Sequence, residues 1–140
     1  MSSSLNEPVK IKRHVIAGIE KHGWECLPFE CCGLLAGRGD IIDQLYRLIN
    51  IADTPETRYF ADPKGLFQAT KLMRTRGEKF QGIYHSHPRS AAYPSPTDVQ
   101  QAYYPEAVYL ILSLVPKLEL RAFSIREGKG EEIGYEIVDD

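Results

Sequence analysis

Residues 108–114, Val-Tyr-Leu-Ile-Leu-Ser-Leu, constrain the fold more than any other part of this chain. The segment is almost wholly apolar and does not alternate with polar residues, which is typical of a strand buried on both faces. Residues 33–37, a shorter apolar run, predict a second buried strand. Helices must then cover both faces of the sheet that contains these strands.

The other periodic segments predict helices and strands along the chain. Apolar residues at helical spacing predict helices over residues 12–26 and 63–78, and residues 52–62 between strand and helix read as an irregular loop. Segments rich in β-branched, aromatic and leucine residues predict the remaining strands, at residues 9–11, 41–51, 80–87, 118–125 and 133–138. The first and last of these are expected at sheet edges. The predicted class is mixed α/β, with one mixed β-sheet flanked by helices.

The length of 140 residues is that of one ordinary domain. We expect residues 1–8 to form a flexible N-terminus and residues 9–140 to form a single domain. A domain of this size buries roughly two-thirds of its unfolded surface and needs no metal in order to fold. A metal site in this chain is therefore expected to be catalytic rather than structural.

Charge and hydropathy exclude several classes of partner. The chain has 17 Lys and Arg against 19 Asp and Glu without a basic cluster, so we expect no nucleic-acid binding. The first residues lack the pattern of a signal peptide, and no apolar stretch approaches the ~20 residues of a membrane span. The chain has three cysteines, Cys26, Cys31 and Cys32, and the last two are adjacent. A disulfide framework uses an even number of cysteines that are spread along the chain, so none is predicted here. We expect a cytoplasmic protein without membrane contact, and the sequence leaves its oligomeric state open.

Two histidines separated by one residue form a candidate metal-binding site. His85 and His87 lie at the end of a predicted strand, where residues two apart point to the same face. Two neighbouring imidazoles repel each other when both are protonated, and a cation removes that cost. Neutral imidazoles bind zinc well, and one nearby carboxylate would leave a coordination position open for water. A His-x-His pair also occurs by chance, so the spacing alone does not decide for a metal.

The segment Ser95-Pro96-Thr97-Asp98 has the form of a helix start. Ser at the cap, Pro at the first helical position and Asp at the third resemble a capping box, which is a structural role. A metal-binding role is compatible with it, because an acidic residue in the first turn can cap a helix and also face an ion. His14 and His22 are single histidines within a predicted helix, and we interpret them as structural.

Taken jointly, these motifs resemble the signature of the JAMM, or MPN-plus, zinc metallopeptidases. His-Ser-His-Pro at residues 85–88 is followed after six residues by Ser95 and Asp98. Upstream, Glu30 precedes the Gly-Leu-Leu of residues 33–35, in the order that this family shows. The resemblance covers about residues 9–125 and is closest to the short prokaryotic members. It implies the cytidine-deaminase-like fold of the family.

The resemblance also implies the roles of individual residues. His85, His87 and Asp98 would bind one Zn²⁺ per chain, with a water molecule as the fourth ligand. Glu30 would act as general base on that water, and Ser95 would donate a hydrogen bond to the oxyanion of the tetrahedral intermediate. Zinc lowers the pKa of its bound water to about 7, which makes a nucleophile available at neutral pH. The position of Glu30 alone carries little signal, so its role depends on the resemblance.

The family hydrolyses peptide or isopeptide bonds that follow the C-terminal tails of ubiquitin-like proteins, and its short prokaryotic members are associated with sulfur-carrier proteins of that kind. The resemblance therefore implies a metallopeptidase or isopeptidase whose substrate is such a tail, with residues 52–62 and 89–94 as the expected contacts. The alternative is a catalytically inactive MPN-type scaffold, a class that typically lacks one or more metal ligands. A phage-tail or cell-wall peptidase ranks lower, and nucleobase deamination is not expected, because His-x-Glu and Pro-Cys-x-x-Cys are missing.

Overall fold

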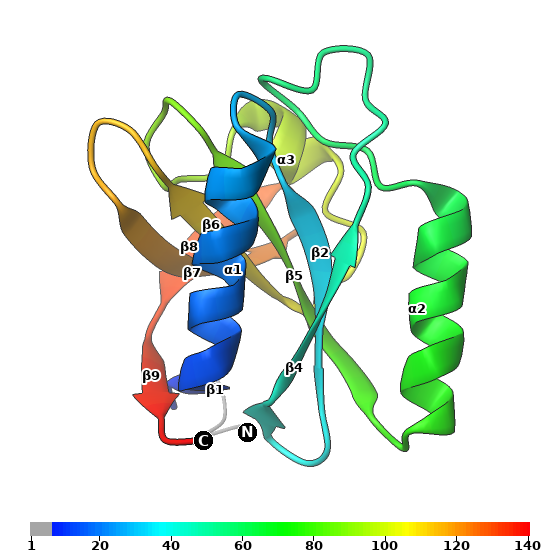
Figure 1. The fold of residues 1–140 in the computed structure, drawn as a ribbon. Helices are drawn as coiled ribbons and strands as arrows, with labels where there is room; N and C mark the ends of the chain where they lie inside the picture. Colours follow the sequence, from blue (N-terminus) through cyan, green and yellow to red (C-terminus); the bar gives the residue numbers. More distant parts are fainter. Residues whose placement is uncertain (1–6) are drawn as a thin grey trace.

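The structure is a computed structural model that describes residues 7–140 (Figure 1). The expected flexible N-terminus falls largely on residues 1–6, which lie outside the described residues. In chain order the elements are β1 (Val9–Lys12), α1 (Arg13–Cys26), β2 (Cys32–Gly37), β3 (Ile41–Ile42), β4 (Gln44–Leu48), α2 (Pro63–Thr75), β5 (Lys79–His87), α3 (Pro96–Gln100), β6 (Val108–Ser113), β7 (Glu119–Arg126), β8 (Lys129–Ile133) and β9 (Tyr135–Val138).

The strands form two sheets. The larger sheet has the order β4-β2-β5-β6-β7-β8, and within it only the neighbours β5 and β6 run parallel. The smaller sheet has the order β3-β1-β9, with both pairings parallel. The predicted mixed α/β class is confirmed, but the strands are divided between two sheets instead of one.

Two interruptions of the chain produce the second sheet. Residues 41–51, expected as one strand, are broken at Asp43, so β3 joins the small sheet and β4 joins the large one. Gly134 separates β8 from β9 in the same way. The small sheet places β1 at its centre, so the prediction of an edge strand there was wrong. The sequence analysis also missed β8 as a separate strand, because its residues are mostly polar, as is common where an exposed edge must not pair with other chains.

Helices cover both faces of the large sheet (Figure 1). On one face α1 packs Ile19 into a core cluster that includes Leu35 of β2. On the other face α2 packs Met73 into a cluster that includes Leu34. Leu34 and Leu35 are neighbours that face opposite helices, because side chains alternate along a strand.

The strand that most constrained the sequence analysis is confirmed. Every residue of β6 is buried, and the strand lies between β5 and β7 inside the large sheet. Among residues 7–140, none of the helices combines the length and the apolar character that crossing a bilayer requires.

A contact between Gly33 and Tyr84 determines how closely β2 and β5 approach. A Cβ atom at Gly33 would lie 2.3 Å from the Tyr84 ring and 2.5 Å from the carbonyl oxygen of Tyr46. The hydroxyl of Tyr84 is 2.8 Å from Nδ1 of His22, and both of these side chains are buried. This hydrogen bond connects α1 to the strand that ends at His87.

We expect Gly33→Ala to lower the free energy of unfolding by about 2–3 kcal/mol, since an added methyl group meets a buried ring and a peptide oxygen that cannot withdraw. Gly65→Ala is the matched control: it lies in α2, where the new Cβ would meet only the Leu48 side chain at 3.7 Å. It should raise stability by about 0.5–1 kcal/mol. Urea unfolding measures both, and a Gly33→Ala protein as stable as wild type would contradict the described contact.

His22 should make stability depend on pH. Burial, assisted by the Arg47 cation and opposed by Glu25, lowers the pKa of His22 from 6.5 to about 4. The unfolded chain therefore binds a proton near pH 6.5 that the folded chain resists, and the free energy of unfolding falls as the pH drops from 6.5 towards 4. We expect a loss on the order of 2 kcal/mol from this residue. His22→Gln, which does not titrate, should show a smaller loss in urea titrations across the same interval; equal losses would contradict the assignment.

Candidate functional site

The carboxyl end of β5 brings the two histidines together. Tyr84 packs into the cluster beneath α1, so His85 and His87 both project from the other face of the strand, and Ser86 lies on the same face as Tyr84. The ring centroids of the two histidines are 5.1 Å apart, which confirms the predicted common face. Both side chains are buried. The site lies where β5 pairs with the parallel strand β6, and the carboxyl ends of parallel strands are where open sheets commonly bind ligands.

Asp98 reaches both rings from the first turn of α3. Its Oδ2 lies 3.0 Å from Nε2 of His87 and 3.2 Å from Nε2 of His85. The predicted capping box is confirmed: the Asp98 N–H donates to Oγ of Ser95 at 3.0 Å, and the Ser95 N–H donates to Oδ2 of Asp98 at 2.8 Å. One carboxylate thus caps the helix and faces both histidines.

The neighbouring groups keep Asp98 ionised although it is buried. Burial raises the pKa of this carboxyl, but the imidazoles of His85 and His87 and the Ser95 N–H lower it by more, so the net pKa is below its usual range. For His87 the balance is reversed: burial lowers its pKa, whereas Asp98 and the Ala91 carbonyl raise it to a value above the ordinary one. The site therefore holds a negative charge that attracts a proton or a cation towards the histidine nitrogens.

The ring nitrogens are arranged as metal-binding imidazoles usually are. Nδ1 of His87 lies 2.8 Å from the Ala91 carbonyl, which can only accept, so Nδ1 carries the proton and Nε2 is left to face Asp98. Neither ring nitrogen of His85 has a hydrogen-bond partner among residues 7–140, because the 3.2 Å approach to Asp98 lacks hydrogen-bond geometry. Buried polar atoms without a protein partner are rare, and such nitrogens fit the role of metal ligands.

These distances fit a small divalent cation. Ligands at 2.0–2.1 Å in a tetrahedral site lie about 3.3 Å from one another. The two Nε2–Oδ2 distances of 3.0 and 3.2 Å are close to that separation. Two imidazoles and one carboxylate form a donor set that zinc and several other divalent ions accept.

Glu30 lies at the same centre, two residues before β2. Only 3% of the residue is exposed, and its Oε1 has no hydrogen-bond partner in the described part of the chain. Burial raises the pKa of Glu30 to about 8, with His87 lowering it and Asp98 raising it. A carboxylate oxygen of Glu30 and one nitrogen from each of His85 and His87 lie within 4.8 Å of one another. The geometry therefore offers Glu30 either as an alternative third ligand or as the neighbour of a bound water.

Ser95 lies beside Asp98, as the motif implied. Its Oγ accepts the Asp98 N–H, and within the described residues its hydroxyl hydrogen has no acceptor. That hydrogen is free to be donated to a substrate atom.

Tyr59, which was not predicted from the sequence, also contacts the centre. Its ring stacks on His85 with centroids 4.6 Å apart and an interplanar angle of 28°. Tyr59 belongs to the irregular segment between β4 and α2, and no short-range pattern distinguishes an aromatic residue there.

An apolar groove of about 430 Å³ opens beside the histidines. Its lining comes from the start of β2, the end of β4, residues 59–61, α2, Phe80 and Ile83 of β5, and Gln101, Tyr103 and Tyr104. Tyr59 belongs both to this lining and to the stack on His85, so the groove and the centre adjoin. The expected contact loop 52–62 thus contributes to the groove, whereas none of residues 89–94 lines it in the described structure.

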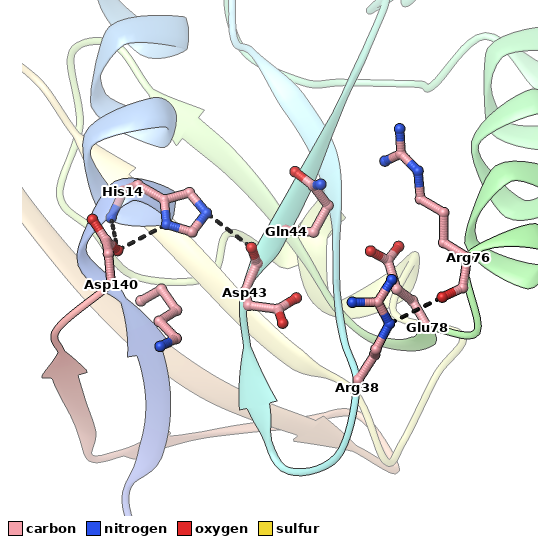
Figure 2. Close-up of a pocket in the computed structure, with 8 residues that line it drawn as sticks. His14, Arg38, Asp43, Gln44, Arg76, Glu78 and Asp140 are labelled. Atoms are coloured by element: carbon pink, nitrogen blue, oxygen red, sulfur yellow. Dashed lines mark hydrogen bonds and ion pairs between the residues drawn. The ribbon is translucent and has the colours of Figure 1, made fainter.

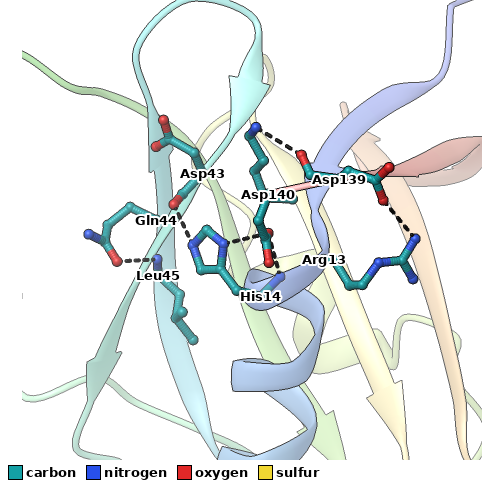
Figure 3. A network of polar contacts seen from close by, with 8 residues as sticks. Arg13, His14, Asp43, Gln44, Leu45, Asp139 and Asp140 are labelled. Atoms are coloured by element: carbon teal, nitrogen blue, oxygen red, sulfur yellow. Dashed lines mark hydrogen bonds and ion pairs between the residues drawn. The ribbon is translucent and has the colours of Figure 1, made fainter.

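A polar pocket of about 460 Å³ lies at the opposite end of β5, roughly 26 Å along the strand from His87 (Figure 2). Several of its polar groups form hydrogen bonds with one another: Nδ1 of His14 lies 2.8 Å from Oδ1 of Asp140, and the Arg38 guanidinium donates to the main-chain carbonyl of Arg76 at 3.0 Å. Figure 3 shows that Asp140 also accepts the main-chain N–H of His14 at 3.0 Å, and so caps α1, whose N-cap Lys12 provides no side-chain cap. These hydrogen bonds give His14 a structural role, as predicted from the sequence.

The cysteines beside Glu30 do not contribute a nucleophile. Cys31 and Cys32 are free and buried, in the clusters beneath α1 and α2 respectively. Burial raises the pKa of each thiol to about 12. Thiols with such pKa values stay protonated at neutral pH and are weak nucleophiles.

Comparison with known sequences places these observations in a family. Residues 12–126 match the family of prokaryotic homologs of the JAB domain. The chain is 37% identical over 102 residues to a probable TtuB-protein conjugate cleaving protease of Thermus thermophilus, covering 73% of the chain and 66% of that protein. It is 38% identical over 88 residues to a desampylase of Haloferax volcanii, covering 61% of the chain and 63% of that protein. Both matches thus span less than two thirds of the relative.

A third relative is matched over nearly its whole length. The chain is 30% identical over 132 residues to a CysO-cysteine peptidase of Mycobacterium tuberculosis, covering 92% of the chain and 90% of that protein.

Solved structures confirm the predicted fold. A protein from Desulfitobacterium hafniense is similar with a TM-score of 0.83 and 31% identity, over 94% of this chain and 93% of that one. A JAB1/MPN domain protein from Archaeoglobus fulgidus has a TM-score of 0.67 and 22% identity, over 95% and 100% of the two chains. The second likeness, at this identity, concerns the fold alone.

Proposed function

This chain belongs to the family of prokaryotic homologs of the JAB domain, and on that premise we propose that it is a zinc-dependent hydrolase of peptide or isopeptide bonds after the C-terminal tail of a ubiquitin-like protein. The convergence of His85, His87 and Asp98 beside Glu30 is the observation that carries the proposal. The named activities of the three relatives, on a TtuB-protein conjugate, in desampylation and on CysO-cysteine, support the substrate class.

We assign one Zn²⁺ per chain to His85, His87 and Asp98. Asp98 is favoured over Glu30 as the third ligand because its Oδ2 approaches both Nε2 atoms almost equally. When bound, the ion supplies an open coordination position whose water has a pKa of about 7. The Ala91 carbonyl keeps His87 in the tautomer with a free Nε2, and the Tyr59 stack orients the His85 ring.

Glu30 then acts as the general base, because the positive charge of a bound ion would lower the pKa that burial raises to about 8 and so favour the ionised carboxylate. Its carboxylate takes a proton from the attacking water and passes it to the leaving nitrogen, which departs poorly as an anion. The free hydrogen of the Ser95 hydroxyl donates to the substrate oxygen that gains negative charge. The burial of Glu30, at 3% exposure, keeps bulk water away from this proton transfer.

The groove beside the centre is the proposed binding place of the tail. Its apolar lining suits an extended segment, and β4, at the edge of the large sheet, has one side on which no strand of residues 7–140 takes up its main-chain hydrogen bonds. Free cysteines are usual in a reducing compartment, so we place the activity in the cytoplasm. A binding scaffold without activity is less favoured, because all of the motif positions are filled and His85, His87, Asp98 and Glu30 converge.

Zinc binding separates the roles of the two carboxylates. Wild type and Glu30→Gln should each hold one zinc by elemental analysis and gain thermal stability with added ZnCl₂, about 2.7 kcal/mol at a concentration 100-fold above Kd. Asp98→Ala should lose most of the zinc and most of the stabilisation. Retention of zinc by Asp98→Ala together with its loss from Glu30→Gln would instead identify Glu30 as the third ligand.

Activity tests the substrate class directly. We expect the zinc-loaded chain to cleave a TtuB-protein conjugate, CysO-cysteine or both, with cleavage stopped by 1,10-phenanthroline and restored by zinc. Glu30→Gln should lower kcat by about 10²–10⁴-fold, because a general base is removed. Ser95→Ala should lower kcat by about 10²–10³-fold, because an oxyanion donor is removed. The absence of chelator-sensitive cleavage of either substrate, measured by mass spectrometry, would overturn the assignment.

A further inference from the structure

We propose that Asn50 is a positioning residue, whose carboxamide ties the loop of residues 51–61 to the main chain of Glu30 and so holds the general base and the His85 ring in place. This inference rests on the proposed function, in which Glu30 is the base. Asn50 lies two residues after the end of β4 and touches neither histidine in any hydrogen bond of the described residues.

The side chain of Asn50 uses its full hydrogen-bonding capacity. Its Oδ1 accepts the main-chain N–H groups of Ala52 and Phe60, both at 3.0 Å. Its Nδ2 donates to the carbonyls of Glu30 and Arg58, both at 3.1 Å. An amide group offers two donors and two acceptor lone pairs, so nothing remains for solvent. Such complete use indicates a group that determines a local geometry.

Asn50 and the loop of residues 51–61 together bind both main-chain polar groups of Glu30. The Glu30 N–H donates to the Pro55 carbonyl at 2.8 Å, and the Glu30 carbonyl accepts from Asn50. The Oε1 atom of Glu30 has no hydrogen-bond partner within residues 7–140. The position of this carboxylate therefore depends on its main chain, and the main chain depends on the loop.

Asn50 also binds the main chain on both sides of Tyr59. Two of its bonds go to Arg58 and Phe60, the residues on either side of Tyr59. The Tyr59 ring stacks on His85, whose two nitrogens make no hydrogen bond within the described residues. The stack is thus one of the packing contacts that restrain the rotation of that buried ring, and Asn50 holds the stacking residue from both sides.

Two substitutions and one control test this role. Asn50→Ala removes all four bonds, whereas Asn50→Asp keeps the two acceptor bonds to the loop and loses both donor bonds, to the carbonyls of Glu30 and Arg58. Thr57→Ala is the control, because Thr57 lies in the same loop and its hydroxyl contacts only the Thr54 carbonyl, at 3.5 Å. The measurements are amide hydrogen exchange of the full chain by NMR, zinc content, and kcat and KM on whichever of the TtuB-protein conjugate and CysO-cysteine the wild type cleaves.

We expect both Asn50 variants to exchange the Glu30 amide at least tenfold faster, with the amides of β6 unchanged. In Asn50→Asp the Phe60 amide should stay protected, since its acceptor is kept. With the responsive substrate, kcat should fall at least tenfold, KM should stay within about twofold, and zinc should remain stoichiometric. Thr57→Ala should match wild type in every measurement.

Three results would overturn the proposal: Glu30 exchange within twofold of wild type in both variants, an unchanged kcat despite faster exchange, or equal loss of protection in β6, which would indicate a general structural role. If the wild type cleaves neither substrate, the proposed function fails, and the exchange data still decide whether Asn50 holds Glu30. If Asn50→Ala does not fold, Asn50→Asp decides alone.

Discussion

One carboxylate oxygen organises the functional end of this molecule. Oδ2 of Asp98 accepts the Ser95 N–H and lies beside Nε2 of both His85 and His87. A buried negative charge is costly unless positive or donating groups surround it. The end of β5 and the start of α3 must therefore meet at this oxygen.

The parts of the site that the sequence predicted are those with short-range rules. His85 and His87 share a face because strand residues alternate, and Ser95 and Asp98 form a capping box because a helix start has fixed spacing. Burial of β6 on both faces followed from its composition in the same way. Glu30 is different, because its place depends on the β2–β5 pairing that sets Cys32 opposite His85, more than fifty residues along the chain. Only the family resemblance identified it.

Dependence on distant residues also explains why the sequence did not predict Tyr59, Asn50 or the second sheet. Tyr59 and Asn50 act through a loop whose course is determined by hydrogen bonds to distant residues rather than by its own pattern. The division into two sheets depends on breaks at Asp43 and Gly134, where nothing in the local sequence requires the chain to change sheets.

Glu30 is held between two partners of different kinds. On the strand side, the Cys31 N–H donates to Oγ of Ser86 at 2.8 Å and the Ser86 N–H donates to the Cys31 carbonyl at 3.1 Å. On the loop side, Asn50 and Pro55 bind the peptide groups of Glu30 itself. The segment joining Pro28 to β2 is thus anchored at the adjacent residues Glu30 and Cys31, and Oε1 of the Glu30 side chain has no hydrogen-bond partner within residues 7–140.

The alternation of side chains along β5 limits where the chain can change length. Adding or removing one residue between Gly82 and His85 would exchange the two faces, sending an imidazole beneath α1 and the Tyr84 ring towards Asp98. Every buried partner of the strand would then be mismatched at once. Insertions and deletions are tolerable only in connections that hold no residue of the site, such as residues 127–128 between β7 and β8, so those turns can diverge in length while the strand that carries the histidines cannot.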